Sequence, residues 1–313
     1  MFTVGLATVA MDVVMQTAEL PKEDGFAVIE KTSYMPGGSG TNVIAQIARL
    51  SGKCGFVAQI GSDGIGARIR RSILDEGIDD AGLKVLDGGS SLHTQIVVDA
   101  SGKKFILLNM GDAFLSLKMD ERDYEYCLSG DILYTDLLPG GPAIEAVKRA
   151  HGAGKKVVFN LQVGVGVMNG MGVSREDILG VLQYVDVFAP CREGLFALAG
   201  TEKLDEAVKF IRKHFSGLLL VTLGGDGSVA FSDDGAVTRI GVPDSKVVDT
   251  TGAGDSYLGA FIYAYYKEKR PLEESMKFAA VCAGVTCGKL GARSGPTLDE
   301  AKAAFAEAVW KNA

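Results

Sequence analysis

The sequence has few of the residues that build disulfide frameworks and metal sites. Its 313 residues include only three histidines, and none of its cysteines forms a C-x-x-C pair or shows zinc-ligand spacing. An odd number of cysteines without a framework is typical of free thiols in a reducing cytosol. The composition therefore argues against a disulfide scaffold and a structural zinc module. The five cysteines are Cys54, Cys127, Cys191, Cys282 and Cys287.

Long apolar runs and an excess of positive charge are also missing. No stretch approaches the ~20 apolar residues of a membrane span. The N-terminal run MFTVGLATVAMD lacks the basic start of a signal peptide, and Asp12 interrupts it. The net charge of −7 gives no general attraction to nucleic acid or to an anionic membrane. We therefore expect a cytoplasmic protein that binds neither of them and holds any anionic substrate with local donors.

Glycine, by contrast, is abundant, with 41 residues that gather where apolar runs end. Strand-like runs such as DILYTDL, KKVVFNL and GLLLVTLG alternate with helix-like runs. This order predicts an α/β fold with a mostly parallel central sheet covered by helices on both faces, a three-layer α-β-α arrangement. No linker is visible, so residues 1–313 are expected to form one domain.

Two segments, about 13–36 and 92–110, break the alternation. The second predicts a β-hairpin that turns at Asp99-Ala100-Ser101-Gly102. Because both segments look extended, we expect them to meet as a small β-sheet lid over the main domain. The N-terminal run FTVGLATVAMDVV predicts one buried strand that ends near Asp12. The last helix is expected over residues 298–312, behind a capping box.

The strongest chemical signal is VVDTTGAGDSYLGAF, residues 247–261. A β-rich run enters a glycine turn there, and a long helix leaves it. Phosphate oxygens are favoured at the positive end of a helix, where a turn of small residues lets them approach the amides. Asp255 adds nothing to such anion binding, so its presence suggests a catalytic base. The alternative is a helix whose first turn carries an acidic residue only because it suits the dipole.

Two further glycine turns open near strand ends. PGGSGTNVIAQIARL, residues 36–50, lacks the Lys-Ser/Thr of a P-loop and the G-x-G-x-x-G spacing of a dinucleotide site. The segment is typical of either a loop whose backbone donors bind a polyol or a tight turn that binds no ligand. TLGGDGSVAF, residues 222–231, follows an apolar strand. Since ligands of open parallel sheets bind beyond the carboxyl ends of the strands, all three turns point to one crevice.

These segments resemble the ribokinase-like (pfkB) carbohydrate kinases over nearly the whole chain. The family has two signature segments, which look like PGGSGTNVIAQIARLSGKCGFVAQIGSDGIG and DTTGAGDSYLGAF here. The end of the first strand at Asp12, the TLGGDG turn and the late KLGARSGPT segment are also similar to the family pattern. The resemblance implies ATP-dependent phosphorylation of a hydroxyl group on a small sugar, with Mg²⁺ and in many members K⁺.

The resemblance also implies roles for single positions. Asp255 corresponds to the general base that takes the proton of the substrate hydroxyl. The anion hole around the transferred phosphoryl group corresponds to Gly252, Ala253 and Gly254. The positions that bind sugar hydroxyls correspond to Asp12, Gly38 and Asn42. The turn beside ATP corresponds to Thr222, Gly224 and Gly227. The monovalent-cation site corresponds to Asp249 and Thr251, with the backbone near Gly291.

One segment departs from the family. Members carry an N-x-x-E motif whose Glu helps to organise magnesium and phosphate, but this chain reads Cys191-Arg192-Glu193-Gly194. Glu193, or Asn160 at the end of VVFNL, is expected to support the divalent cation through water. The alternative is that the changed segment weakens the binding of the divalent cation.

The sequence does not name the substrate. The absence of a clear basic pair in the pocket-side segments favours an unphosphorylated sugar. A nucleoside kinase of the same superfamily is the nearest alternative, and a non-catalytic sugar or nucleotide sensor is another, because of the altered N-x-x-E segment. The resemblance also implies that two lid segments can pair between subunits, so a homodimer through the lid is expected.

Overall fold

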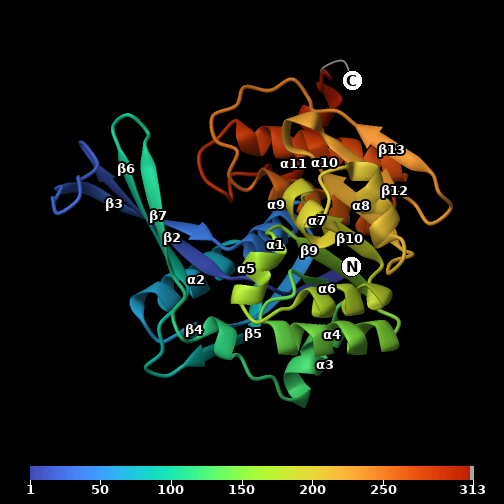
Figure 1. Ribbon diagram of the computed structural model, residues 1–313, viewed down its shortest axis with the longest axis horizontal. Helices are drawn as coiled ribbons and strands as arrows, with labels where there is room; N and C mark the ends of the chain where they lie inside the picture. Colours follow the sequence, from blue (N-terminus) through green and yellow to red (C-terminus); the bar gives the residue numbers. More distant parts are fainter. Residues whose placement is uncertain (311–313) are drawn as a thin grey trace.

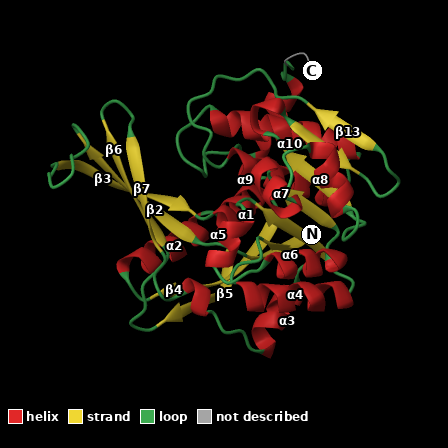
Figure 2. Ribbon diagram, viewed as in Figure 1, coloured by secondary structure: helices red, strands yellow, loops and turns green. Residues whose placement is uncertain are grey.

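The computed structural model describes residues 1–310, and these form two β-sheets with helices around the larger one (Figure 1, Figure 2). The large sheet contains β1 (Phe2–Leu6), β4 (Lys53–Gly61), β5 (Asp79–Leu86), β8 (Ile132–Thr135), β9 (Lys156–Leu161), β10 (Val187–Pro190), β11 (Leu218–Thr222), β12 (Ser228–Phe231) and β13 (Val237–Ile240). Their order across the sheet is β13-β12-β11-β10-β9-β8-β1-β4-β5. The strands from β5 to β11 pair in parallel, whereas β12 and β13 add an antiparallel hairpin at one edge. The predicted fold class is therefore confirmed.

Helices cover both faces of this sheet (Figure 1). One group consists of α1, α9, α10 and α11, which pack against one another, and a second group contains α3, α4 and α6. In the described residues no helix is long and apolar enough to cross a membrane. The helices are α1 (Ser39–Arg49), α2 (Gly64–Asp75), α3 (Glu121–Ser129), α4 (Gly140–Gly152), α5 (Val165–Gly170), α6 (Arg175–Val181), α7 (Arg192–Ala199), α8 (Leu204–Ile211), α9 (Ala253–Ile262), α10 (Leu272–Cys287) and α11 (Leu298–Ala306).

The core lies along the central parallel strands. All four residues of β8 are buried, and in β4 every residue is buried except Lys53. Strands of this kind are apolar on both faces because helices cover both faces. The carboxyl ends of the strands are therefore held rigidly, and they carry the turns that form the candidate site.

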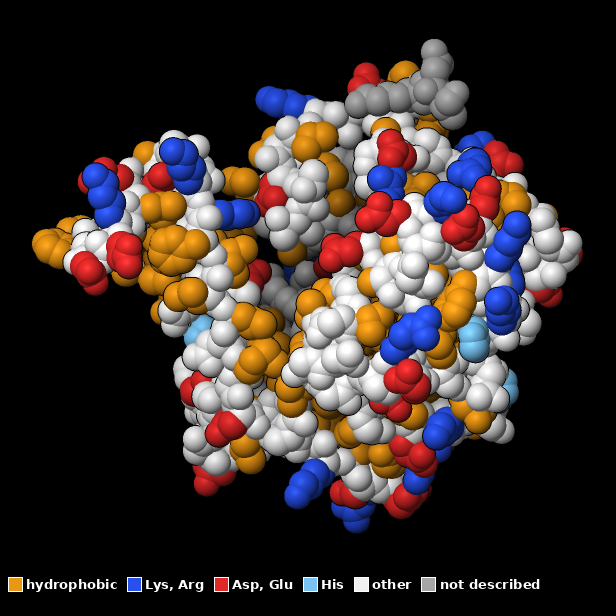
Figure 3. All heavy atoms as spheres, in the orientation of Figure 1, with side chains coloured by type: hydrophobic (Ala, Val, Ile, Leu, Met, Phe, Trp, Pro, Cys, Tyr) orange, Lys and Arg blue, Asp and Glu red, His pale blue; other side chains and the backbone are white. Residues whose placement is uncertain are grey.

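The small sheet has a different character. It consists of β2 (Ala10–Thr17), β3 (Ile29–Gly37), β6 (His93–Asp99) and β7 (Lys104–Asn109) in the order β3-β2-β6-β7. It projects from the body to the left in Figure 1, and all six residues of β7 are exposed. A space-filling view shows the molecule hollowed between this sheet and the body (Figure 3). The hairpin predicted at Asp99–Gly102 joins β6 to β7.

The N-terminal run was predicted wrongly as one strand. The chain leaves the large sheet after Leu6 and enters the small sheet at Ala10, so Asp12 lies inside β2 instead of at a strand end. Hydrophobic periodicity cannot reveal this change, because both strands are apolar and only their partners differ.

Four elements were not predicted, namely β5, α3, α5 and α7. The last helix has its predicted capping box of Thr297 and Glu300, but it ends at Ala306. Residues 311–313, which include the end of the predicted helix, lie outside the described residues.

Candidate active site

The site begins at the N-terminus of α9, where a glycine turn brings the chain against another loop. Gly252 caps the helix with φ 76°, and a Cβ atom there would lie 2.2 Å from the carbonyl oxygen of Ala292. Only glycine combines this backbone conformation with so close an approach. Ala253 donates its amide to the Thr250 carbonyl (3.2 Å), whereas the amide of Gly254 has no acceptor in residues 1–310. A free amide at the positive end of a ten-residue helix can bind an anion.

Asp255 follows in the first turn of α9 and is only 5% exposed. Its Oδ1 accepts hydrogen bonds from Ser39 Oγ (2.8 Å) and Gln162 Nε2 (2.6 Å), and its Oδ2 accepts one from Asn42 Nδ2 (2.8 Å). Burial raises the pKa of Asp255, and these three donors oppose the rise. An ionised carboxylate has about four acceptor positions. Three are occupied, so the open one is on Oδ2.

The N-terminus of α1 faces the same carboxylate. Gly38 caps α1, and Ser39 and Asn42 lie on the turn that approaches Asp255. The predicted residue Asp12 lies nearby, because a Cβ atom at Gly37 would be 2.7 Å from its Oδ2. Its Oδ1 accepts a hydrogen bond from Thr94 of β6 (2.5 Å). The structure thus brings both predicted signature segments to one point, with Asp12 beside it.

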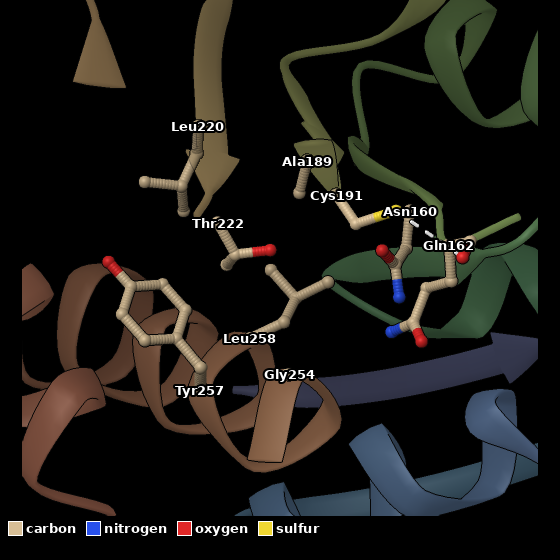
Figure 4. Close-up of a pocket in the computed structure, with 9 residues that line it drawn as sticks. All are labelled: Asn160, Gln162, Ala189, Cys191, Leu220, Thr222, Gly254, Tyr257 and Leu258. Atoms are coloured by element: carbon tan, nitrogen blue, oxygen red, sulfur yellow. Dashed lines mark hydrogen bonds between the residues drawn. The ribbon is translucent and has the colours of Figure 1, made fainter. Parts of the chain in front are cut away.

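A small cavity of about 50 Å³ lies beside the N-terminal part of α9 (Figure 4). The ends of β9, β10 and β11 contribute most of its walls, and Gly254, Tyr257 and Leu258 of α9 close it. Gln162 connects the cavity to the base, since its side chain lines the cavity and donates to Asp255. Asn160 donates its amide to the hydroxyl of Tyr134 (3.1 Å). The polar lining is neutral, which suits a group that brings its own negative charge.

The predicted turn beside ATP lies next to this cavity. Thr222 ends β11 and lines the cavity, and the following turn closes through the Leu223 amide and the Gly227 carbonyl (2.8 Å). Arg192 of α7 donates to the Leu223 carbonyl (2.8 Å) and forms an ion pair with Asp226. The glycine turn is therefore supported by the same segment that departs from the family motif.

That departing segment is packed so that no glutamate side chain fits at the motif position. Gly194 is buried, and a Cβ atom there would lie 2.6 Å from the Leu161 carbonyl oxygen. Cys191 caps α7 by accepting from the Gly194 amide (3.3 Å), and its thiol donates to the Gln162 carbonyl (3.3 Å). Glu193 is exposed and is not among the residues that line the cavity. Within residues 1–310, no three His, Cys, Asp or Glu side chains are placed so that they could hold a metal ion together.

The predicted monovalent-cation residues also come together. Asp249 accepts from the amide and hydroxyl of Thr251 (3.0 and 2.7 Å) and from the Gly291 amide (3.0 Å). Burial alone would raise the pKa of Asp249, but these hydrogen bonds outweigh it and lower the pKa. The carboxylate is thus kept ionised beside the anion-binding turn, which suits a nearby cation.

Three residues at the site were not predicted: Ser39, Gln162 and Arg293. Ser39 lies in the glycine run of the first signature, and Gln162 follows a strand that ends at the crevice, so their positions offered a weak signal. Arg293 lies in the late KLGARSGPT segment and donates to Asn42, 251 residues away in sequence. No local pattern indicates such a contact.

The chain is similar to several known proteins along most of its length. The family model described as pfkB family carbohydrate kinase matches residues 2–299. An ATP-dependent ribose-1-phosphate kinase of Halopiger xanaduensis is 29% identical, with 95% of each chain covered. Fructokinase-1 of Zea mays is 29% identical, with 87% of this chain and 89% of that protein covered. The crystal structure of a ribokinase from Thermotoga maritima is 25% identical, with a TM-score of 0.82, 97% of this chain and 99% of that chain covered.

Proposed function

The chain belongs to the pfkB family of carbohydrate kinases, and from this we propose that it transfers the γ-phosphoryl group of ATP to a hydroxyl of a small sugar, with Asp255 as the general base. The observation that carries the proposal is the hydrogen bonding of Asp255. Two donors occupy Oδ1 and one occupies Oδ2, which leaves an acceptor position on Oδ2. A substrate hydroxyl that donates there loses its proton to Asp255 as its oxygen attacks phosphorus.

The turn at residues 252–254 forms the anion hole of this reaction. The amide of Gly254 has no acceptor in the described part of the chain and lies at the positive end of α9. Charge that develops on the transferred phosphoryl group is stabilised there by the amides of Gly252 and Gly254, because the amide of Ala253 already donates to the Thr250 carbonyl. Because the base lies in the same helical turn, the hydroxyl and the phosphoryl group are held next to each other.

The sugar lies between α1 and the small sheet, against Asp12, Gly38 and Asn42. Asp12 uses Oδ1 for Thr94, so its Oδ2 is available to accept from sugar hydroxyls. The small sheet acts as a lid, inserted as two segments into a single kinase domain. The hollow between this sheet and the body supports the assignment (Figure 3).

ATP lies beyond the ends of β9, β10 and β11, with its phosphates towards Gly254. Thr222, Gly224 and Gly227 form the turn beside the nucleotide. Mg²⁺ neutralises charge on the phosphates when it is bound. It keeps several waters and needs few direct protein ligands, so the neutral side-chain oxygen of Asn160 at the cavity fits it. Glu193 would support Mg²⁺ through water, and Asp249 and Thr251 would hold K⁺.

The exposed face of the lid supports a homodimer. Of the six residues in β7, Phe105, Ile106, Leu107 and Leu108 are large, apolar and between 38% and 59% exposed. An edge strand of this kind is usually covered or paired. Sedimentation analysis of the wild type and of Leu107→Lys tests this directly, because the variant is expected to shift a dimer towards the monomer. The cytoplasmic location stays a prediction.

A coupled assay of ADP release over a library of sugars and nucleosides, with and without K⁺, tests the function. We expect turnover with an unphosphorylated sugar. Preferential turnover of nucleosides would move the assignment to the nucleoside kinases of the superfamily. Binding of ATP and sugars, measured by calorimetry, without turnover of any alcohol would overturn the kinase assignment in favour of a sensor.

A further inference from the structure

The loop between α10 and α11, residues 288–297, contacts three parts of the candidate site with three consecutive residues. The Gly291 amide donates to Asp249 (3.0 Å), and the Ala292 carbonyl lies against Gly252. Arg293 then donates to Asn42 through Nε (2.9 Å). Of the three, only Arg293 acts through its side chain, and no role has been given to it so far.

Arg293 is surrounded by neutral acceptors. Its Nη2 donates to the Gly37 carbonyl (2.9 Å) and to Thr41 Oγ1 (2.8 Å), and its Nη1 donates to Ser72 Oγ (3.2 Å). Within residues 1–310 it has no carboxylate at ion-pair distance. Burial lowers its pKa to about 10, so the guanidinium remains charged at neutral pH. The planar group is thus held by hydrogen bonds on all three nitrogens.

The contact with Asn42 decides which end of that amide faces the base. The oxygen and nitrogen of an amide side chain are nearly equal in size, so neighbours determine its orientation. An arginine can only donate, and it therefore faces Oδ1 of Asn42. Nδ2 is then directed to Asp255 Oδ2 at 2.8 Å. In the flipped orientation, Oδ1 of Asn42 would face the carboxyl group of Asp255. This oxygen would repel the ionised carboxylate, but it would accept a hydrogen bond from the protonated carboxylic acid.

We propose that Arg293 is a positioning residue of the kinase reaction: it holds the Asn42 amide with Nδ2 towards Asp255 and so favours the ionised base. This inference rests on the proposed function, because it matters only if Asp255 takes a proton. Arg293 itself contacts neither the base nor the open acceptor position on Oδ2.

Other groups around Asp255 also titrate or carry charge. Asp12 of β2 interacts electrostatically with Arg293, as does Asp255 itself. Tyr134 of β8, whose pKa burial raises, interacts electrostatically with Asp255 and with Asp136, and burial raises the pKa of Asp136 to about 6. The neighbours from α1 and from the end of β9 are neutral. Because these groups are common to wild type and variant, a difference between the two pH profiles reports on Arg293.

The test is the pH dependence of kcat for Arg293→Lys, which keeps a positive charge but loses the Nε donor to Asn42. We expect the pKa of Asp255 to rise further, so that the acid limb of the profile moves to higher pH. On the acid limb kcat should fall by up to about 10-fold, and the deficit should shrink as the pH rises. A deficit that is equal at every pH would mean a merely structural role and would overturn the inference.

Two comparisons separate the possible causes. Arg49 touches the same loop through the Gly295 carbonyl (2.9 Å) and pairs with Glu76, but it does not contact Asn42. Arg49→Met should therefore lower thermal stability and leave the acid limb in place, and an equal shift there would count against Arg293. In an Asn42→Ala background, Arg293→Lys should no longer move the limb. A shift that persists would show that Arg293 does not act through Asn42.

Should Arg293→Lys fail to fold by circular dichroism, Arg293→Met carries the same test and should give a shift at least as large. The wild-type assay keeps the two claims apart. Absence of turnover in the wild type with every alcohol refutes the proposed function. Turnover in the wild type, with an unshifted acid limb in the variants, refutes only the role of Arg293.

Discussion

The two sides of Asp255 are built differently. On the sugar side, Ser39 and Asn42 of α1 donate hydrogen bonds to the carboxylate, and Arg293 of the 288–297 loop fixes the amide of Asn42. On the phosphate side, the cavity has a neutral polar lining, and the motif position that would hold a glutamate is Gly194. The sugar side is therefore organised by charge and hydrogen bonding, and the phosphate side by backbone and packing.

This difference indicates where the chain controls the reaction. A buried carboxylate needs donors to remain ionised, and it receives them from segments far apart in sequence. A phosphate chain arrives with its own charge and metal, so a neutral cavity beside a helix N-terminus is sufficient to receive it. Changes to the donors of Asp255 should consequently alter turnover and its pH dependence, whereas changes to the other residues of the phosphate side should alter metal requirement and stability.

The largest effect is expected for Asp255→Asn. The amide cannot take the proton of the substrate hydroxyl, so kcat should fall by ~10²–10⁴. Binding of ATP and sugar, measured by calorimetry, should persist, because the anion hole and the sugar contacts remain. A variant with near wild-type turnover would show that Asp255 is not the base. The comparison of the sugar side with the phosphate side would then not describe the reaction.

Gln162→Leu should have the next largest effect. It removes the 2.6 Å donor to Oδ1 of Asp255. The pKa of Asp255, already raised by burial, should rise further, so the base is ionised only at higher pH. The acid limb of kcat should move to higher pH, with a loss on that limb of up to about 10-fold that narrows as the pH rises. Gln183→Leu, on the exposed surface, is the control, and an unshifted limb in Gln162→Leu would contradict the prediction.

Glu193→Gln tests the phosphate side. If Glu193 supports the divalent cation through water, the Mg²⁺ concentration for half-maximal rate should rise by about 10-fold. The rate at saturating Mg²⁺ should stay near that of the wild type, because the base is untouched. Glu202→Gln, an exposed glutamate outside the site, serves as the matched control. An unchanged Mg²⁺ requirement would assign metal support to other groups such as Asn160.

Gly194→Ala should change turnover least. The added Cβ atom would meet the Leu161 carbonyl oxygen at 2.6 Å, so the free energy of unfolding should fall by ~1–3 kcal/mol in urea titration. Gly180→Ala in α6 is the control, since no atom lies within 4 Å of the Cβ position there, and it should be neutral or slightly stabilising. Equal stability of both variants would mean that packing does not explain the missing glutamate.

Much of the fold could be predicted from the sequence, because alternating strands and helices leave a periodic pattern. The helix after Gly38, the hairpin at Asp99–Gly102 and the capping box at Thr297 were all read correctly. The change from β1 to β2 was not predicted, because two apolar strands that follow each other closely in sequence look like a single strand even when they belong to different sheets. Periodicity reports which residues are buried and not which partner buries them.

The DTTGAGD run shows which properties of the site follow from the sequence and which depend on the tertiary structure. The sequence by itself determined that an anion-binding turn precedes a helix and that an acidic residue, Asp255, occupies its first turn. These are local properties of glycine and of helix N-termini. Only the tertiary structure decided which oxygen of Asp255 is open and that Gln162 and Arg293 support it, because hydrogen bonds spanning 93 and 251 residues leave no spacing in the chain.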